Sequence, residues 1–154
     1  MVVYLLPKKI IELSKANTWD RAKQEWVLHD IVDYDYYEYN CLCGHPIKEL
    51  CILKNKYNGK ETIVGNCCVK KFLKHFNSER IFSSIKRVKK EINKSFNTDF
   101  IQIAHDKGII TDWEYDFYMN IWCKQNRQLA KKQLLKKIEI NKKILCSKNL
   151  FVDT

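Results

Sequence analysis

The sequence predicts an α+β protein in which a cysteine-rich knuckle, a β-hairpin and a helix are flanked by further helices. Three observations predict this fold class. Five of the seven cysteines lie between residues 41 and 68. The dipeptide Asn58-Gly59, a strong hairpin-turn signal, lies between them. Beyond residue 76, apolar residues recur at the helical period of 3.6 residues, so the C-terminal half is predicted to be mainly helical.

The length of 154 residues allows one domain or two small ones, and it suffices for an ordinary hydrophobic core. We divide the chain into an N-terminal helical or strand segment, 1–40, a metal-binding module, 41–76, and a basic helical region, 77–154. We expect the last region to pack on the module as one compact domain. No run of eighteen apolar residues predicts a membrane span, and the N-terminus has no signal-peptide pattern.

The N-terminal segment contains two helix-start signals. Pro7 is suited to the first turn of a helix, with Ile10, Ile11 and Leu13 on its apolar side. Thr18 is a candidate cap for a second short helix that runs through Ala22 and Trp26. An alternative for residues 26–32 is a strand, with Val27 and Ile31 alternating with polar His29. Residues 33–40 predict a loop whose tyrosines pack on the module, project from the surface or stack on bases; they are Tyr34, Tyr36, Tyr37 and Tyr39.

The hairpin is predicted from residues 50–54 and 60–64, joined by a turn over 55–59, because Asn and Gly both tolerate positive φ. Gly65 ends the second strand, and Asn66 is a plausible cap for the next helix. The expected buried face of this helix consists of Val69, Phe72, Leu73 and Phe76.

The region after residue 76 predicts four helices. The first has an apolar face of Ile81, Phe82, Ile85, Val88 and Ile92. The second is capped by Thr98 and ends near Gly108. A capping box from Thr111 to Glu114 opens the third, with a core stripe of Trp113, Phe117 and Ile121. The last runs roughly over residues 128–146, and its apolar residues are Leu134, Leu135, Ile138 and Leu145.

The clustered cysteines predict a metal site, because zinc prefers four thiolate or imidazole ligands arranged as a tetrahedron. A knuckle with two thiols, a hairpin, and a helix that closes the site give a treble-clef-like zinc module. We predict the ligands Cys41, Cys43, Cys51 and Cys68, with Cys67 and then His45 as alternates and His75 after them. Cys68 is preferred to Cys67 because adjacent helical residues diverge by about 100°.

Two alternatives apply to the cysteines. The whole cluster can consist of buried structural thiols without a metal. Cys123 and Cys146 are isolated, which indicates core or incidental surface positions. Clustered thiols in an intracellular, reducing compartment bind metal more often than they form disulfides, so we expect a cytoplasmic or nuclear protein.

The formal net charge of +10 is unevenly distributed. Residues 41–76 carry a net +5, residues 77–98 a net +4 and residues 123–154 a net +7, whereas residues 99–122 carry a net −4. Segregated positive charge indicates a polyanionic partner, most often nucleic acid. The alternative is a lysine-rich composition that reflects an AT-rich genome.

The order of these motifs resembles a known group of proteins. Cys41-Leu-Cys-Gly-His-Pro-Ile47 and Val64-Gly-Asn-Cys-Cys-Val-Lys-Lys-Phe72 are similar to motifs of small, poorly characterised treble-clef-like zinc-binding proteins of phages, large DNA viruses and bacteria. The resemblance implies a metal-binding module with a helical tail, used in nucleic-acid metabolism, and a host-cell location if the source is viral. Ala130 stands where the resemblance leads us to expect a serine cap for the last helix.

The favoured function is a non-enzymatic zinc protein that binds DNA or RNA through lysines. The expected contact residues are Lys54, Lys56, Lys60, Lys70, Lys71, Lys74, Lys86, Arg87, Lys89 and Lys90. The first alternative is a protein–protein adaptor that uses the zinc module. The second is a metal-dependent nuclease based on His45, with Asp112, Glu114 and Asp116 as candidate magnesium ligands; alternate residues on a helix, however, do not share a face.

Overall fold

The computed structural model describes residues 2–73 and 77–147, and side chains from residue 5 onward. The chain divides into two compact units, Met1–Ser78 and Glu79–Thr154, which are described separately below. The strands of the described residues all belong to the first unit. The predicted boundary at residues 76–77 lies close to this division, and the predicted segments 1–40 and 41–76 share one sheet in the first unit.

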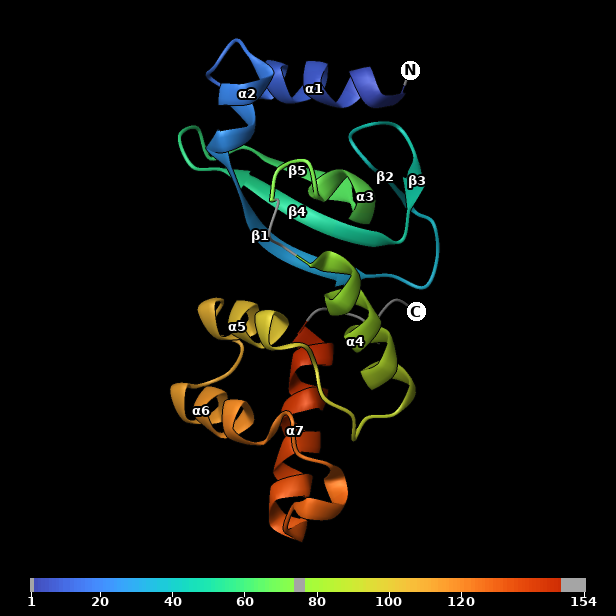
Figure 1. Ribbon diagram of the computed structural model, residues 1–154, viewed down its shortest axis with the longest axis vertical. Coiled ribbons are helices and arrows are strands. Elements are labelled where there is room, and N and C mark those ends of the chain that lie inside the picture. Colours follow the sequence, from blue (N-terminus) through green and yellow to red (C-terminus); the bar gives the residue numbers. More distant parts are fainter. Residues whose placement is uncertain (1, 74–76, 148–154) are drawn as a thin grey trace. The chain divides into compact units, whose positions relative to one another are not determined.

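The first unit is a small antiparallel sheet with short helices around it (Figure 1). The three main strands run in the order β1-β4-β5, and β2 and β3 form a separate two-stranded ribbon. The elements are α1 (Val2–Leu13), α2 (Trp19–Ala22), the 3₁₀ turn η1 (Lys23–Glu25), β1 (Trp26–Asp33), β2 (Tyr39–Asn40), β3 (Pro46–Ile47), β4 (Glu49–Asn55), β5 (Glu61–Gly65) and α3 (Asn66–Val69).

The first helix begins earlier than predicted. Pro7 does not open it but lies inside α1, which starts at Val2. Leu6 and Ile10, one turn apart, are fully buried. Tertiary packing of this apolar side accounts for the helix continuing through a proline that lacks a backbone donor.

Residues 26–33 form a strand, so the strand alternative is confirmed and the second helix is shorter than predicted. Thr18 occupies the N-cap position of α2, without a side-chain hydrogen bond, and α2 ends at Ala22. A bulge at His29 shifts the register of β1 against β4. Because a bulge inserts one residue, it reverses the alternation of faces: Val27 is 43% exposed while Ile31 is fully buried.

The predicted hairpin is confirmed as β4 and β5, with Gly59 at φ +74° in the turn. The following helix is much shorter than predicted, because α3 ends at Val69. Phe72 is placed by a turn instead, and its ring meets that of Trp19 edge-on at a centroid distance of 5.4 Å. Asn66 is the first helical residue rather than the cap, which is Gly65. Phe76 lies outside the described residues.

A buried carboxylate ties the start of the hairpin turn to the N-terminal helices. Glu25, only 5% exposed, accepts hydrogen bonds from the backbone N–H groups of Lys15 and Ala16 at 2.9 and 2.8 Å. It also accepts one from Asn55 Nδ2 at 2.9 Å. The Oδ1 atom of Asn55 in turn accepts from the N–H groups of Tyr57 and Asn58. Glu25 therefore fixes the turn as well as the helices before it.

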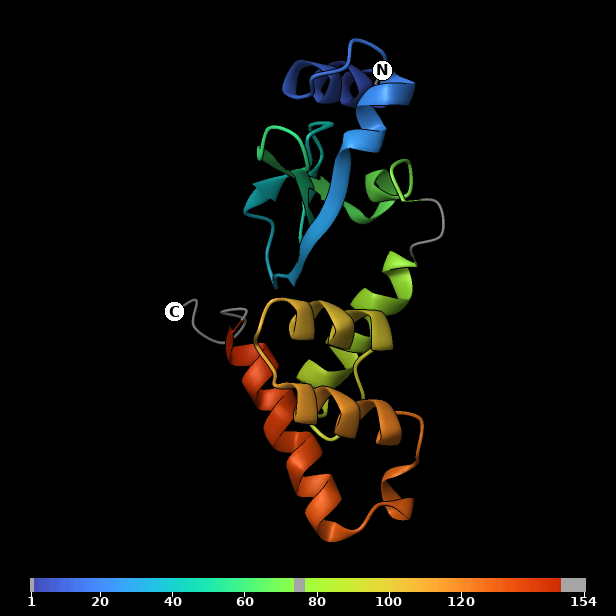
Figure 2. The same cartoon turned by 90° about the vertical axis from the view of Figure 1, so that its left-hand side faces the viewer.

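The described part of the second unit is built of helices, as predicted for the C-terminal half. These are α4 (Ser78–Lys90), α5 (Thr98–Asp106), α6 (Asp112–Ile121), the 3₁₀ turn η2 (Asn126–Gln128) and α7 (Lys131–Ser147). Helices α5 and α6 lie side by side and α7 runs across them (Figure 2). The predicted core face of α4 is buried except for Ile92, which follows the helix end. Asn97, not Thr98, caps α5.

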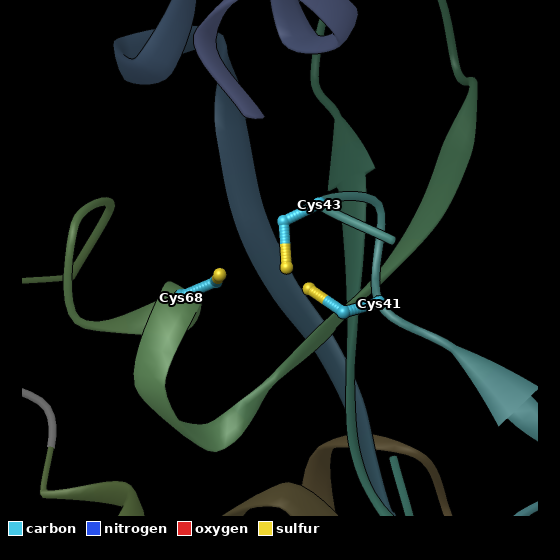
Figure 3. Close-up of side chains that lie close together, drawn as sticks. All are labelled: Cys41, Cys43 and Cys68. Atoms are coloured by element: carbon cyan, nitrogen blue, oxygen red, sulfur yellow. The ribbon is translucent and has the colours of Figure 1, made fainter. Parts of the chain in front are cut away.

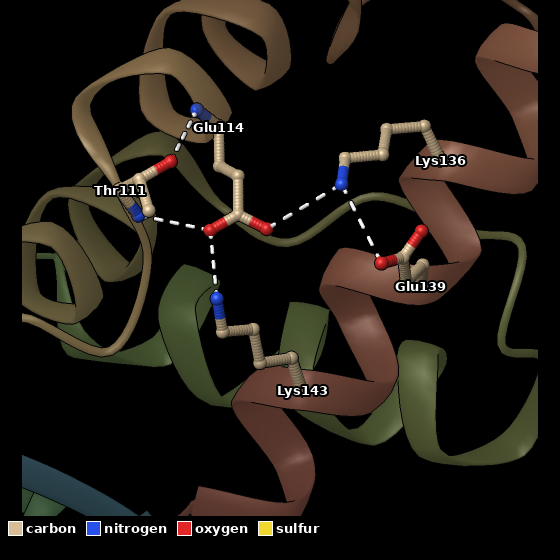
Figure 4. Close-up of polar contacts among 5 residues, drawn as sticks. All are labelled: Thr111, Glu114, Lys136, Glu139 and Lys143. Atoms are coloured by element: carbon tan, nitrogen blue, oxygen red, sulfur yellow. Dashed lines mark hydrogen bonds and ion pairs between the residues drawn. The ribbon is translucent and has the colours of Figure 1, made fainter.

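The buried face of α6 differs from the predicted stripe. The Thr111–Glu114 capping box is present, but Trp113 is 60% exposed and stacks on Phe117. Glu114 points inward instead and pairs with two lysines of α7, Lys143 at 2.9 Å and Lys136 at 3.8 Å (Figure 4). A buried carboxylate is tolerated where it is hydrogen-bonded and paired, and this lets the polar residue replace tryptophan in the core.

Helix α7 begins at Lys131, three residues later than predicted, and buries a partly polar face. Leu135 is 57% exposed, whereas Asn141 is fully buried. Asn141 accepts a hydrogen bond from the Tyr118 hydroxyl at 2.7 Å and donates to the carbonyls of Ile92 and Lys94, each at 2.7 Å. This one amide joins α6, α7 and the segment between α4 and α5.

The fold is thus mixed, with many helices, a small antiparallel sheet and a cluster of cysteines. Within the described ranges, no helix has both the length and the apolar character needed to cross a membrane.

Candidate metal centre

The first two thiols are held by a tight turn between β2 and β3. Tyr39 and Asn40 pair with Ile47 and Pro46, which brings the ends of the turn together. Inside it, the N–H of Cys41 donates to the carbonyl of His45 at 2.7 Å, and the N–H of Gly44 donates to that of Cys41 at 2.8 Å. Gly44 has φ +102°, a conformation that favours glycine. The curled backbone lets Cys41 and Cys43 face the same side, which an extended strand would not.

The third thiol comes from the helix that follows the hairpin. Cys68 lies in α3 and points toward the knuckle sulfurs (Figure 3). The sulfur atoms of Cys41, Cys43 and Cys68 all lie within 4.8 Å of one another. Cys41 and Cys43 are buried, and Cys68 is half-buried. Three thiols from two elements therefore converge on one point, and the group can hold a metal ion.

The backbone at Gly65 packs closely against the turn that holds Cys41 and Cys43. Its N–H donates to Cys41 Sγ at 3.2 Å, a contact that stabilises a thiolate. A Cβ atom on Gly65 would lie 3.0 Å from Ile47 Cγ2, tighter than ordinary packing. The absence of a side chain lets β5 pass close to the knuckle.

The thiols of Cys41 and Cys68 differ in how readily they lose a proton. The hydrogen bond from the Cys68 thiol, together with those from the N–H groups of Cys43 and Gly65, lowers the pKa of Cys41 to about 5 against the opposing effect of burial. The same hydrogen bond, with burial, raises the pKa of Cys68. One thiolate within a cluster of thiols is a suitable start for metal binding, since metals bind the deprotonated sulfur.

The structure leaves the other candidate ligands outside this group. Cys51 is fully buried in β4, opposite Ile31 and Val64. Burial, followed by the charges of Glu49 and Cys41, raises the pKa of Cys51 to about 12, which favours a neutral packed thiol. Cys67 and His45 are both exposed. His75 lies outside the described residues, and the ligand set as a whole stays a prediction.

Most of the predicted basic contact residues of the first unit lie on its surface. Lys56, Lys60, Lys70 and Lys71 are exposed, and Lys54 is half-buried beside Glu61 in the hairpin register. Lys74 lies outside the described residues. The turn between β4 and β5 also carries Tyr57, 61% exposed, with the Nζ atom of Lys56 at 5.7 Å from its ring centre.

The predicted basic residues of the second unit belong to α4. Lys86, Arg87 and Lys90 are exposed and Lys89 is half-buried. The ammonium group of Lys86 lies 5.7 Å from the ring centre of Phe82, and Arg87 donates to the Ser95 carbonyl at 3.2 Å. Lys86, Arg87 and Lys90 therefore present charge to solvent from this helix.

The tyrosine-rich segment before the knuckle forms a second exposed aromatic surface. Tyr36, Tyr37 and Tyr39 are 43%, 67% and 36% exposed. Tyr34 stacks on Tyr39 at 5.3 Å, and Lys48 Nζ lies 4.7 Å from the Tyr37 ring centre. Residues 33–40 contain three acidic residues and no lysine or arginine.

Two of the three carboxylates considered as magnesium ligands, Asp112 and Glu114, have other partners. Asp112 lies 2.6 Å from His105 Nε2, and Glu114 is held by the capping box and by Lys143. Within residues 2–73 and 77–147, the three cysteines are the group of metal-ligating side chains that comes together.

Comparison with known proteins gave no match: no protein-family model, no curated protein and no solved structure matches this chain. The resemblance given above stays a prediction. Sequence reasoning missed the support from Gly65 and the Glu25–Asn55 pair. Gly65 directly before the helix was a visible sign of close packing, whereas no local pattern connects Glu25 with a turn thirty residues away.

Proposed function

We propose that the first unit is a structural zinc module of treble-clef type and that the protein binds nucleic acid without catalysing a reaction. The observation that carries the metal assignment is the convergence of three thiols from a knuckle and a helix. Sulfur-rich donor sets favour zinc over magnesium or calcium, and structural zinc sites have four protein ligands.

For the fourth position we choose His45. It follows Cys43 by two residues in the same turn, its carbonyl already accepts the Cys41 N–H, and its side chain is exposed and able to rotate. Cys51 is a less suitable ligand because its thiol is not among the converging sulfurs and packs in β4, opposite Ile31 and Val64.

Cobalt substitution tests this ligand set. We expect one metal per chain and a tetrahedral Co²⁺ spectrum, whose sulfur charge-transfer band reflects the number of thiolates. Cys68→Ser should lower that band and the metal affinity. His45→Ala should weaken binding with the band retained, whereas Cys51→Ser should change neither. A folded protein that binds no zinc or cobalt would refute the module.

Nucleic-acid binding is supported by exposed lysines near the module and along α4. Lysine neutralises phosphate and releases counterions, so affinity should fall with salt and depend weakly on sequence. Arginine is scarce, and bidentate guanine recognition prefers arginine.

A salt titration of binding to labelled oligonucleotides tests this role. The logarithm of the association constant should fall linearly with the logarithm of salt concentration. Replacing both Lys56 and Lys60 with alanine should make the slope shallower by about 1.5, since each phosphate contact contributes about 0.7 to 0.9. Binding that is absent at low salt, or independent of salt, would exclude nucleic-acid binding through these lysines.

A protein adaptor is the second candidate, and the acidic tyrosine surface of residues 33–40 favours it. Tyrosine is enriched at protein interfaces, and the contact of Lys48 with the Tyr37 ring is an example, within this chain, of a cation packed on such a ring. The partner would then be a basic protein. A complex that persists after nuclease treatment and is lost in Tyr37→Ser would support this function. The seven unpaired thiols suit an intracellular, reducing location for either function.

A further inference from the structure

We propose that the turn between β4 and β5 is a base-stacking contact for single-stranded nucleic acid, with Tyr57 as the platform and Lys56 and Lys60 as phosphate contacts. This inference rests on the proposed nucleic-acid function and names the strand type and the contact element. We define residues 56–60 as the hairpin tip.

The hairpin tip combines an exposed ring with positive charge. Tyr57 is 61% exposed, and residues 54–61 contain three lysines and one glutamate. That glutamate, Glu61, has a partner in His29 at 3.9 Å. The Nζ atom of Lys56 lies over the Tyr57 ring, 5.7 Å from its centre, so a base stacked on the opposite face would have an ammonium group across the ring. Aromatic stacking together with adjacent lysines is the combination that holds single strands.

The backbone of the hairpin tip is held internally. The N–H of Lys56 donates to the Glu25 carbonyl, and those of Tyr57 and Asn58 donate to Asn55 Oδ1. The N–H groups of residues 59 and 60 donate to the Asn55 carbonyl and to Asn58 Oδ1. All five N–H groups are thus satisfied, which leaves phosphate contacts to the lysine side chains.

Two further contacts fix the hairpin tip to the rest of the first unit. Asn58 Nδ2 donates to the Leu13 carbonyl at the end of α1, at 2.9 Å. Asn55, 1% exposed, connects the tip to buried Glu25. A platform fixed before binding loses little conformational entropy when a base stacks on it.

Charge distinguishes this platform from the other exposed tyrosines. Residues 33–40 expose two acidic side chains, Asp35 and Glu38, and contain no lysine or arginine, so this surface attracts phosphate less than the hairpin tip does, although Tyr37 is as exposed as Tyr57. Stacking also requires an unpaired base with a free face, so Tyr57 adds affinity for single strands and little for duplexes.

Fluorescence anisotropy on the full chain tests the proposal at low salt. The probes are oligo(dT) and oligo(U) of about 15 nucleotides, within the usual site sizes, and a DNA duplex of equal length. We expect Tyr57→Ser to weaken single-strand binding about tenfold, because the variant loses the stacking of one base on the ring. Duplex binding should change less than about twofold, and Tyr57→Phe should bind like the wild type. The oligo(dT) and oligo(U) arms show whether DNA or RNA is preferred.

The control is Tyr37→Ser, which removes an equally exposed ring from the acidic surface and should leave both affinities unchanged. Equal loss on single strands and duplex in Tyr57→Ser, or no loss on either, overturns the stacking role while the general nucleic-acid function survives. Wild-type protein that binds none of the probes overturns both. Circular dichroism of each variant shows whether an affinity change reflects unfolding.

Discussion

Two buried polar residues, Glu25 in the first unit and Asn141 in the second, each hold a loop in place through hydrogen bonds from several directions. Glu25 receives three hydrogen bonds, and Asn141 makes three. A buried group with all its partners present stabilises a unique arrangement, whereas a missing partner leaves a desolvated group behind. Single substitutions at these points should therefore have large effects.

Glu25→Gln should destabilise the first unit by about 1–3 kcal/mol at neutral pH, since an amide cannot accept all three hydrogen bonds. Although burial favours the neutral form, the hydrogen bonds from Asn55, Lys15 and Ala16 lower the pKa of Glu25 below its ordinary 4.5. The carboxylate therefore stabilises the fold above about pH 4.5, and this contribution is lost as the pH falls through the lowered folded-state pKa. Urea unfolding across pH measures the difference.

The gap between wild type and Glu25→Gln should narrow as the pH falls. Burial raises the pKa of Glu114 in the second unit, but Lys143 and the Thr111 N–H lower it more, so it too lies below its ordinary value. The plot of unfolding free energy against pH for the wild type therefore contains contributions from both Glu25 and Glu114. The difference between the two proteins isolates Glu25. A gap that stays constant down to acid pH would contradict the role of the charge.

Tyr118→Phe should destabilise the second unit by about 1–3 kcal/mol, because it removes a buried hydroxyl and leaves its hydrogen-bond partners unpaired. That hydroxyl donates to Asn141 and accepts from the buried Phe96 N–H at 3.0 Å. Burial raises the pKa of Tyr118, so the hydroxyl stays neutral at physiological pH. Tyr115→Phe is the matched control, since the Tyr115 hydroxyl bonds to Gln102 at the surface. Chemical denaturation of both variants should show a much smaller loss of unfolding free energy in Tyr115→Phe than in Tyr118→Phe. Equal effects would contradict this account.

At the scale of elements, α7 begins with half of a capping box. The Ala130 N–H donates to Gln133 Oε1 at 2.9 Å, and the Ala130 carbonyl accepts the first helical hydrogen bond, from Leu134. Ala130 has no side-chain oxygen to receive the Gln133 N–H in return. Helix α6 shows the complete version, with Thr111 and Glu114 bonded in both directions.

Ala130→Ser should therefore stabilise the second unit by about 0.5–1 kcal/mol, because a serine oxygen can accept the Gln133 N–H. Thr111→Ala should have the opposite effect, of about 1 kcal/mol, by removing the same contact from α6. Thermal unfolding compares them. No change in Ala130→Ser would show that residue 130 does not act as the cap.

Elements specified by local chemistry could be predicted from the sequence. Asn58-Gly59 specifies its turn through backbone freedom, and the Thr111 capping box specifies a helix start through two reciprocal bonds. Elements whose buried face depends on residues distant in the sequence could not be predicted in this way. Trp113 was expected inside α6, but Lys143 and Lys136 of α7 make Glu114 the buried residue. Phe72 was predicted on a long helix, but it lies in the turn after α3, where its ring packs edge-on against Trp19.

The candidate metal centre was predictable in part for the same reason. Cysteine chemistry and the glycine after the knuckle indicated Cys41, Cys43 and Cys68, and the structure brings these three together. The choice of a further ligand depended on how far the first hairpin strand lies from the knuckle sulfurs, which sequence spacing does not give. Cys51 is close in sequence but belongs to the buried sheet.

At the scale of the whole molecule, the division into two compact units predicts a local response to metal removal. Chelation should shift the NMR cross-peaks of residues near the cysteines, from β2 to α3, and lower the unfolding temperature of the first unit, because metal binding is coupled to folding. Peaks of α5, α6 and α7 should stay in place. Zinc returned in stoichiometric amount should restore the spectrum, and a chain-wide change on chelation would contradict a local response.

In the hairpin tip, the side chains are exposed but the backbone amides are protected, whereas in most surface turns both are open to solvent. Its side chains reach into solvent, yet the amide protons of residues 56–60 are all bonded within the protein. Deuterium should therefore enter these amides slowly, although turns of this kind normally exchange fast. Exchange measured by NMR in Glu25→Gln should be faster at Lys56 and Tyr57 than in the wild type. A tip that is labelled within the first time point in both proteins would show that its bonds open freely.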